Sequence, residues 1–488
     1  MQLSSDSVLH YARNGGDLLK STGSIVFLVL LIGCLSLTQV IAFEGPLRQC
    51  ASNPRYFADE SGRPIVLAGA HTWANLVDMS PNDPPAAFDY EAYLNWLGSY
   101  RHNFIRLWTW ELVSWDTRGN RENKLHTVRP HPWSRVGPGT ALDGNPKFDL
   151  SAFDNEYFSR LRSRVEAAAA REIYVSVMLF EGWGLQFSPE AWASHPFNKA
   201  NNINQIDGDL DGDGRGLEVH TLANQEVTDL QKSYVKHVID TLNDLENVLF
   251  EISNENHPPS TQWQYEIIRF IHDYESSQPN QHPVGMTFQY KGGSNADLFA
   301  SPADWISPNP EGGYREDPPP ADGRKVILTD TDHLWGIGGN QSWVWKSFMR
   351  GHNPLFMDPY DGVVLGSRFD AEWEPIRKAL GYVLFWAQRI DLNTMVPFGN
   401  LTSSSYCLAE VGSEYLVYVP EGGQFSVDLT AATGMLVSEW FDTSSGVSLT
   451  GALVRGGEER LMNSPFGEKG LVLHLKETRW SPEKNSLN

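Results

Sequence analysis

The sequence is poor in cysteine, with three among 488 residues, and no cysteine or histidine cluster has the spacing of a zinc site. It also lacks a glycine-rich phosphate loop after a predicted strand, and the G-x-S-x-G motif is absent. These absences argue against a zinc-finger protein, a phosphate-loop nucleotide enzyme and a serine hydrolase with a nucleophile elbow.

Positive charge is scarce as well. Lys and Arg number 38 against 60 Asp and Glu, which gives a formal net charge of −22. Such a chain repels polyanions, so neither nucleic acid nor an anionic membrane surface is expected as a partner. The sequence does not indicate an oligomeric state. Apolar residues still make up 41% of the chain, enough for one large domain and a smaller one.

The N-terminal segment has the pattern of an export signal. The apolar run SIVFLVLLIGCLSLTQVIAF (24–43) follows Arg13 and Lys20, and Val40-Ile41-Ala42 offers a small-residue cleavage site. We therefore predict that residues 1–43 form a signal peptide or an N-terminal anchor. The protein would be secreted or held at the cell surface, touching a membrane only through an uncleaved leader.

Eight apolar, strand-like runs follow the leader. They are residues 64–71, 103–110, 173–180, 248–253, 283–288, 303–307, 325–330 and 353–358. Helical patterns separate several of them, at 158–172, 227–246 and 261–277, and another follows the last run at 373–390. Strands that are apolar throughout suit a parallel sheet covered on both faces. The predicted fold is therefore α/β, with a (β/α)₈ TIM barrel over residues 44–397.

From about residue 400 the pattern changes to short alternating runs broken by Gly, Asp-Thr and Ser-Ser-Gly. This alternation predicts a small antiparallel β-sandwich domain over residues 398–478, followed by a tail at 479–488.

The end of the fourth run presents one carboxylate between two amides, Asn254-Glu255-Asn256. A carboxyl group on a rigid strand end near aromatic walls can act as a general acid. Glycoside hydrolysis requires a second carboxyl group across the bond, and Asp330 and Asp332 both lie near the end of the seventh run. Either aspartate fits, with Asp330 the first choice.

An Asn-Glu pair ending strand four and an acidic residue closing strand seven resemble the large clan of retaining glycoside hydrolases built on this barrel. The stretch NPRYFADESGRPIVLAGAHTWANL resembles the opening of apiosidase-like and cellulase-like bacterial members. Their barrel commonly precedes a small β-domain named for collagen binding, which YLVYVPEGGQFSVDL and SPFGEKGLVLHL resemble.

The resemblance implies a carbohydrate substrate, Glu255 as acid/base, Asp330 (or Asp332) as nucleophile, and no cofactor for catalysis. The clan normally has Glu at the nucleophile position, so Asp is a departure that bears on whether the anomeric configuration is retained.

Further substrate-binding candidates lie at the strand ends and in their loops. They are His71, Trp73, Arg106, Trp108, Trp110, Glu111, Glu181, Trp183, Asn254, His333, Trp335 and Asp358. Flat indole faces suit pyranose rings, and in the clan an Arg at the place of Arg106 often fixes the nucleophile. Core packing is the alternative for each Trp, and a buried ion pair or amide contact for Glu111 and Glu181. His257 and His333 are expected to orient the catalytic groups.

The acidic stretch DGDLDGDGRGLE satisfies the ligand pattern of a calcium loop. Asp207, Asp209, Asp211 and Glu218 hold its positions 1, 3, 5 and 12, and Asp213 offers its carbonyl at position 7. No helix pattern precedes it, so we expect a structural Ca²⁺ loop and no EF-hand. The alternative is an acidic loop that binds nothing.

Two other functions remain open on the sequence alone. A barrel that has lost catalysis and only binds glycan is kept open by the aspartate at the nucleophile position. A metal-dependent hydrolase is disfavoured because His ligands do not cluster at the strand ends.

Overall fold

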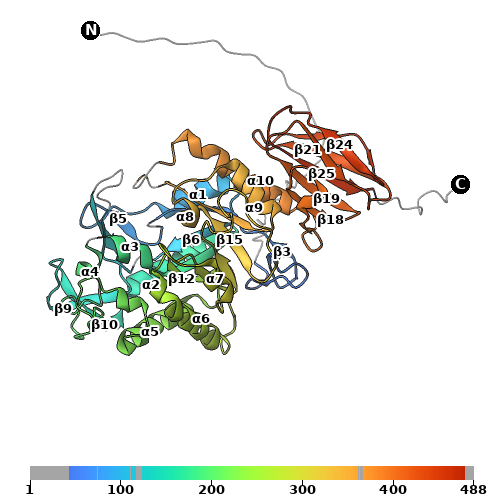
Figure 1. Cartoon of the computed structure of the whole chain (residues 1–488). Coiled ribbons are helices and arrows are strands. Elements are labelled where there is room, and N and C mark those ends of the chain that lie inside the picture. Colours follow the sequence, from blue (N-terminus) through green and yellow to red (C-terminus); the bar gives the residue numbers. More distant parts are fainter. Residues whose placement is uncertain are drawn as a thin grey trace, which may run out of the picture. The chain divides into compact units, whose positions relative to one another are not determined.

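The computed structural model describes residues 43–478 except 74, 110, 117–123, 189, 361 and 363–366 (Figure 1). The described residues belong to one compact unit. Residues 1–42 of the predicted leader and the predicted tail at 479–488 lie outside this range, as does the candidate Trp110.

Eight parallel strands form the predicted barrel. In chain order they are β4 (Gly69–His71), β6 (Phe104–Trp108), β11 (Tyr174–Glu181), β12 (Val248–Asn254), β13 (Val284–Thr287), β14 (Trp305–Ser307), β15 (Val326–Asp330) and β16 (Asn353–Met357). Each overlaps one predicted run, and the order in the sheet is β4-β16-β15-β14-β13-β12-β11-β6. Every residue in them is buried, as a parallel sheet covered on both faces requires. The fold-class prediction is confirmed.

Asparagine side chains join the two end strands of the sheet, β4 and β6. Asn103 Oδ1 accepts from Ala68 N at 2.9 Å, and the Asn103 N–H donates back to Ala68 O at 3.1 Å. Further along, Asn75 donates to Arg106 O and accepts from Trp108 N, both at 2.7 Å. These amides satisfy backbone groups that strand pairing leaves open, and so they nearly close the barrel.

The described α-helices are α1 (Tyr90–Ser99), α2 (Asn155–Ala169), α3 (Gly182–Phe187), α4 (Ala191–Ser194), α5 (Gln225–Leu242), α6 (Thr261–Glu275), α7 (Asn295–Ala300), α8 (Thr331–Leu334), α9 (Gln341–Met349) and α10 (Glu374–Ala387). The long helices cover the outside of the barrel (Figure 1), whereas the short α3 and α8 directly follow the carboxyl ends of β11 and β15. In α6, Trp263, Ile267 and Ile271 recur every four residues and are fully buried, so one stripe packs inward. Among the described residues, none of the helices has the length and apolar character needed to cross a membrane.

Three small antiparallel sheets lie outside the barrel ladder and were not predicted. They comprise β1 (Arg48–Gln49), β2 (Phe57–Ala58) and β3 (Pro64–Ile65); β5 (Asp78–Ser80), β7 (Ser114–Asp116) and β8 (Leu125–Arg129); and β9 (Trp133–Thr140) with β10 (Pro146–Phe153). The β7–β10 strands occupy the long connection between β6 and α2, beside the carboxyl end of β6.

The C-terminal region consists of antiparallel sheets, as predicted. One contains β17 (Val396–Pro397), β18 (Cys407–Glu410), β19 (Glu414–Val419), β25 (Leu471–Glu477), β21 (Met435–Asp442), β22 (Ser448–Thr450) and β23 (Val454–Arg455), and the other pairs β20 (Gln424–Asp428) with β24 (Glu459–Asn463). The rings of Trp345 and Trp386, on α9 and α10, pack on Phe441 of β21, so these sheets share apolar core with the barrel helices. The boundary at 397/398 stays a prediction. Cys50 and Cys407 are buried free thiols.

Candidate active site

A cavity of about 350 Å³ lies among residues at the carboxyl ends of the barrel strands and in the loops that follow them. Nine predicted site residues line it: Trp73, Trp108, Glu181, Trp183, Asn254, Glu255, Asp332, His333 and Trp335. Five others are not part of its wall: His71, Arg106, Glu111, Asp330 and Asp358. The size suits a small part of a larger ligand.

Glu255 has an unusual backbone conformation. β12 ends at Asn254, and Glu255 follows with a φ of 42°, in the left-handed region that non-glycine residues seldom adopt. A Cβ atom on Gly182 would lie 2.4 Å from the Cα of Asn256, so this turn depends on glycine across from it. Backbone strain of this kind concentrates at functional sites.

The Glu255 carboxyl group forms no hydrogen bond or ion pair with any other described residue. Burial raises its pKa well above the ordinary value, and the negative charges of Asp332 and Glu181 raise it further against the opposing charge of Arg106. These shifts favour the protonated form of Glu255, whose side chain is part of the cavity wall.

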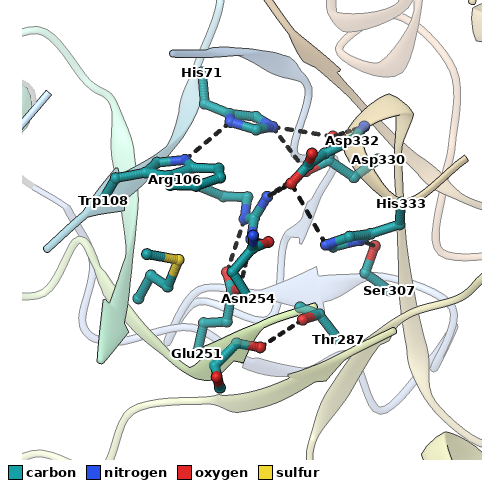
Figure 2. Close-up of polar contacts among 12 residues, drawn as sticks. His71, Arg106, Trp108, Glu251, Asn254, Thr287, Ser307, Asp330, Asp332 and His333 are labelled. Atoms are coloured by element: carbon teal, nitrogen blue, oxygen red, sulfur yellow. Dashed lines mark hydrogen bonds and ion pairs between the residues drawn. The ribbon is translucent and has the colours of Figure 1, made fainter. Parts of the chain in front are cut away.

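Arg106 on β6 organises the acids beside the cavity (Figure 2). Its Nε and Nη2 donate to the two oxygens of Glu251 at 2.8 and 2.6 Å. Its Nη1 donates to Oδ2 of Asp330 at 3.2 Å and to Oδ2 of Asp332 at 2.9 Å, and Nη2 reaches Asn254 Oδ1 at 2.7 Å. One buried guanidinium thus compensates two fully buried carboxylates and positions a third.

His71 fixes Asp330 from the other side (Figure 2). The indole N–H of Trp108 donates to His71 Nδ1 at 3.2 Å. Because an indole nitrogen only donates, Nδ1 accepts and the ring proton sits on Nε2. That Nε2 donates to Asp330, with 3.0 Å to Oδ1 and 2.8 Å to Oδ2.

The two candidate nucleophiles have opposite surroundings. Asp330 is fully buried and caps α8 by accepting from the Asp332 N–H at 3.0 Å. Burial would raise its pKa, but the contacts of His71 and the charge of Arg106 outweigh burial and hold the pKa below its usual range. For Asp332, burial and the charge of Asp330 prevail over Arg106 and raise the pKa to about 6. Only Asp332 lines the cavity.

Glu181 is a third carboxyl group on the wall. Its Oε1 accepts from Gly184 N at 2.9 Å, and Asn254 Nδ2 lies 3.5 Å from Oε2. Burial raises its pKa well above the ordinary value, and the charges of Glu111 and Asp332 add to the effect. Glu111 accepts the Glu181 backbone N–H at 2.8 Å and so positions the strand end from outside the wall.

The remaining predicted residues have structural partners. Asp358 accepts from the buried Arg377 at 2.7 and 2.9 Å. His333 Nδ1 lies 2.6 Å from Ser307 Oγ, and its Nε2 lies 3.8 Å from Asp332 Oδ2. Burial and the charge of Arg106 lower the pKa of His333 well below its ordinary value, so the ring is neutral.

Nine wall residues were not predicted: Trp115, Phe288, Tyr290, Pro310, Arg315, Leu334, Gly336, Ile337 and Met357. Most of them follow strands whose loops are unusual in the sequence, such as FQYKGG after β13 and SPNPEGG after β14. The unusual composition of these loops marks them in the sequence, but it does not predict which of their side chains point into the cavity.

Part of the predicted calcium loop converges. One carboxylate oxygen each from Asp209, Asp211 and Glu218 lies within 4.8 Å of the others. Among the described residues, this is the group of three or more His, Cys, Asp or Glu side chains whose ligand atoms lie close enough together to hold a metal ion. Burial raises the pKa of Glu218, and the neighbouring aspartates add to the effect. Asp207 and Asp213 are outside this group. His257 Nε2 donates to Leu217 O at 2.9 Å, which links the loop to the segment after Glu255.

Comparisons with known proteins agree with the fold. A solved glycoside hydrolase is 14% identical, with 89% of this chain and 97% of that chain covered and a TM-score of 0.57. A glycoside hydrolase family 5 protein from Bacteroides vulgatus is 12% identical over 89% of this chain and 94% of that chain, with a TM-score of 0.58.

Residues 126–291 match a family described as a domain of unknown function, DUF6298. No curated protein matches the chain. At these identities the structural likeness shows the fold alone, a TIM barrel that the chain shares with these two glycoside hydrolases.

Proposed function

We propose that the protein hydrolyses O-glycosidic bonds of a poly- or oligosaccharide. The observation that carries the proposal is the pair of Glu255 and Asp332, two carboxyl groups on one aromatic-walled cavity, of which Asp332 accepts from Arg106 and Glu255 forms no ion pair with a described residue. Environments that separate two carboxyl groups into an acid and a base assign their roles in glycoside hydrolysis.

In the proposed reaction, Glu255 donates its proton to the glycosidic oxygen while an Asp332 carboxylate oxygen attacks the anomeric carbon. The bond to the leaving group breaks, and a glycosyl ester on Asp332 forms. Glu255, now ionised, then takes a proton from water, whose oxygen displaces Asp332 and releases the sugar with its anomeric configuration retained.

Asp332 takes the nucleophile role in preference to Asp330, the first choice from the sequence. Asp330 has no face on the cavity, and His71, Arg106 and the Asp332 N–H occupy its oxygens. Asp332 is bound at one oxygen by Arg106 and reaches the cavity. Asp330 then acts by holding the start of α8 in place.

The tryptophans of the wall support a sugar ligand. Trp73, Trp108, Trp183 and Trp335 line the same cavity as the carboxyl groups, and indole faces bury the C–H faces of pyranose rings. The apiosidase-like subtype and the collagen-binding name of the C-terminal region rest on the sequence resemblance alone.

Two further parts of the proposal concern the whole chain. The leader would export the enzyme to a secreted or cell-surface location. A Ca²⁺ ion held by Asp209, Asp211 and Glu218 would stiffen the loop that His257 contacts, with a structural role only.

The test is hydrolysis of a broad panel of plant and microbial glycans by wild type, Glu255→Gln and Asp332→Asn, with folding checked by circular dichroism. Turnover by wild type and its loss in both folded variants is the expected result. The proposal fails if wild type binds a glycan in calorimetry yet releases no reducing ends, because the protein is then a glycan-binding barrel.

A further inference from the structure

The cavity wall includes a guanidinium, Arg315, that is distinct from Arg106, the residue that serves the buried acids. Arg315 lies in the loop between β14 and β15 and is part of the wall. Its guanidinium carbon stands 5.5 Å from the ring centre of Trp335, and Nη2 donates to Leu334 O. Both contacts use residues that also line the cavity, so the charge is placed beside the ligand space.

Arg315 forms no ion pair with any described residue, and its buried Nε has no hydrogen-bond partner. Two acids of its own loop have other partners, and the exposed Glu316 forms no ion pair with Arg315. Asp317 accepts from the Tyr406 hydroxyl at 2.8 Å and pairs with Arg350 at 3.3 Å, and Glu311 accepts from the backbone of α7 at 3.3 Å. In a chain with 60 acidic and 38 basic residues, a cavity-lining guanidinium without a carboxylate is an exception.

A second cation stands on the adjacent loop. Lys291 follows Tyr290, a wall residue, and its Nζ lies 5.4 Å from that ring centre and 4.7 Å from the ring of Phe187. Lys291 is exposed and forms no ion pair with another described residue. The loops after β13 and β14 therefore each bring an unpaired positive charge, resting on an aromatic ring, to the cavity or its rim.

From these charges we infer that the glycan carries an anionic substituent, either a hexuronate carboxylate or a sulfate ester, which Arg315 binds. The inference rests on the proposed function and specifies its substrate class. A guanidinium presents parallel N–H groups that match two oxygens of such an anion, and Arg315 is part of the cavity wall. Lys291 would add a longer-range attraction.

The test compares one hexuronate-containing oligosaccharide with the same oligosaccharide after its carboxyl groups are reduced to primary alcohols. Arg315→Gln should lower kcat/KM for the acidic substrate roughly 10- to 100-fold and leave the reduced substrate unchanged. Arg315→Lys should restore part of the loss, and Lys291→Gln should have a smaller effect. Arg324→Gln is the matched control, because Arg324 lies in the same loop but pairs with the exposed Asp322.

A sulfated oligosaccharide forms the third arm. A wild-type preference for it that Arg315→Gln abolishes upholds the anionic subsite and identifies sulfate as its ligand. An equal loss on acidic and reduced substrates overturns the inference, since Arg315 would then only support Trp335 and Leu334. A wild-type preference for the reduced substrate overturns it as well, while the proposed hydrolysis stands.

If wild type hydrolyses none of the three substrates, the proposed function fails for this class and binding decides the inference. Calorimetry with Glu255→Gln and with the double variant Glu255→Gln/Arg315→Gln then measures affinity alone. Tighter binding of an anionic oligosaccharide that depends on Arg315 upholds the subsite. Binding that ignores the anionic group, or no binding, overturns it.

Discussion

Two pairs of acids in the barrel differ in what surrounds them, although each pair has one member on or just after β12 and one at or just after the end of β15. Glu251 and Asp330 are completely buried, and Arg106 binds both of them. Glu255 and Asp332, four and two residues further along the chain, line the cavity. Neither member of this second pair has a guanidinium to itself.

The comparison shows how the same residue types serve as scaffold or as reactants. A carboxylate whose oxygens are occupied by fixed donors stays ionised and holds its neighbours in place. A carboxyl group beside other acids, with open space in front of it, acquires a raised pKa and room for a ligand. Glu251 and Asp330 would thus position the two acids that line the cavity.

The largest expected effect comes from changing Glu255, and the contrast is with the same change at Glu251 of the other pair. Glu255→Gln should lower kcat by roughly 10²- to 10⁴-fold with little loss of stability, because it removes only the transferable proton. Glu251→Gln should instead lower the free energy of unfolding, because Arg106 loses the partner that accepts two of its hydrogen bonds. Steady-state kinetics and urea unfolding of both variants separate the two outcomes. Full activity in Glu255→Gln would contradict the proposed difference in role between Glu255 and Glu251.

Removing the shared cation tests the paired acids as a group. Arg106→Met leaves Glu251 and Asp330 buried without compensation, so unfolding free energy should fall by about 3–5 kcal/mol. The control is Arg324→Met, which breaks an exposed ion pair and should cost about 1 kcal/mol or less. Equal costs in urea unfolding would show that the buried network contributes no more than a surface pair.

Calcium offers a milder perturbation away from the cavity. At free Ca²⁺ one hundred times its dissociation constant, the unfolding free energy should rise by about 2.7 kcal/mol over protein in chelator. Asp211→Asn should reduce this gain, whereas Asp428→Asn, an exposed acid that accepts from Thr430 N, should leave it intact. Thermal unfolding with and without Ca²⁺ measures the difference. Identical transitions would mean that the loop binds no cation.

The smallest effect is a shift in the pH profile. The proposed reaction requires ionised Asp332, so kcat/KM should fall as pH drops through about 6, the raised pKa of that group. It should also fall at high pH, when Glu255 loses its proton. Since the charge of Asp330 helps raise the pKa of Asp332, Asp330→Asn should move the acidic limb to lower pH. A limb that stays in place or moves upward would contradict this coupling.

Much of the fold could be predicted from the sequence because parallel barrel strands are apolar along their whole length. All eight runs became strands, and the helices α2, α5, α6 and α10 fall on the predicted patterns. The small sheets between β6 and α2 were missed because their strands are short or mostly solvent-exposed, which weakens the apolar signal.

The site was predictable as a set of strand ends but not in its inner arrangement. Strand alternation predicts that Asp330 and Asp332 point the same way, yet β15 ends at Asp330 and helix α8 begins at Thr331. The turn into the helix sends one aspartate into the buried network and the other to the cavity. Arg315 was missed for a similar reason, because it reaches the cavity from a loop without regular periodicity.

The most direct measurement is to identify the residue that carries the covalent glycosyl intermediate. The enzyme would be incubated with a 2-deoxy-2-fluoro glycoside of its best substrate, digested, and the labelled peptide sequenced by mass spectrometry. The account predicts an adduct on Asp332. An adduct on Asp330, or no adduct from a turned-over substrate whose product has inverted configuration, would contradict it.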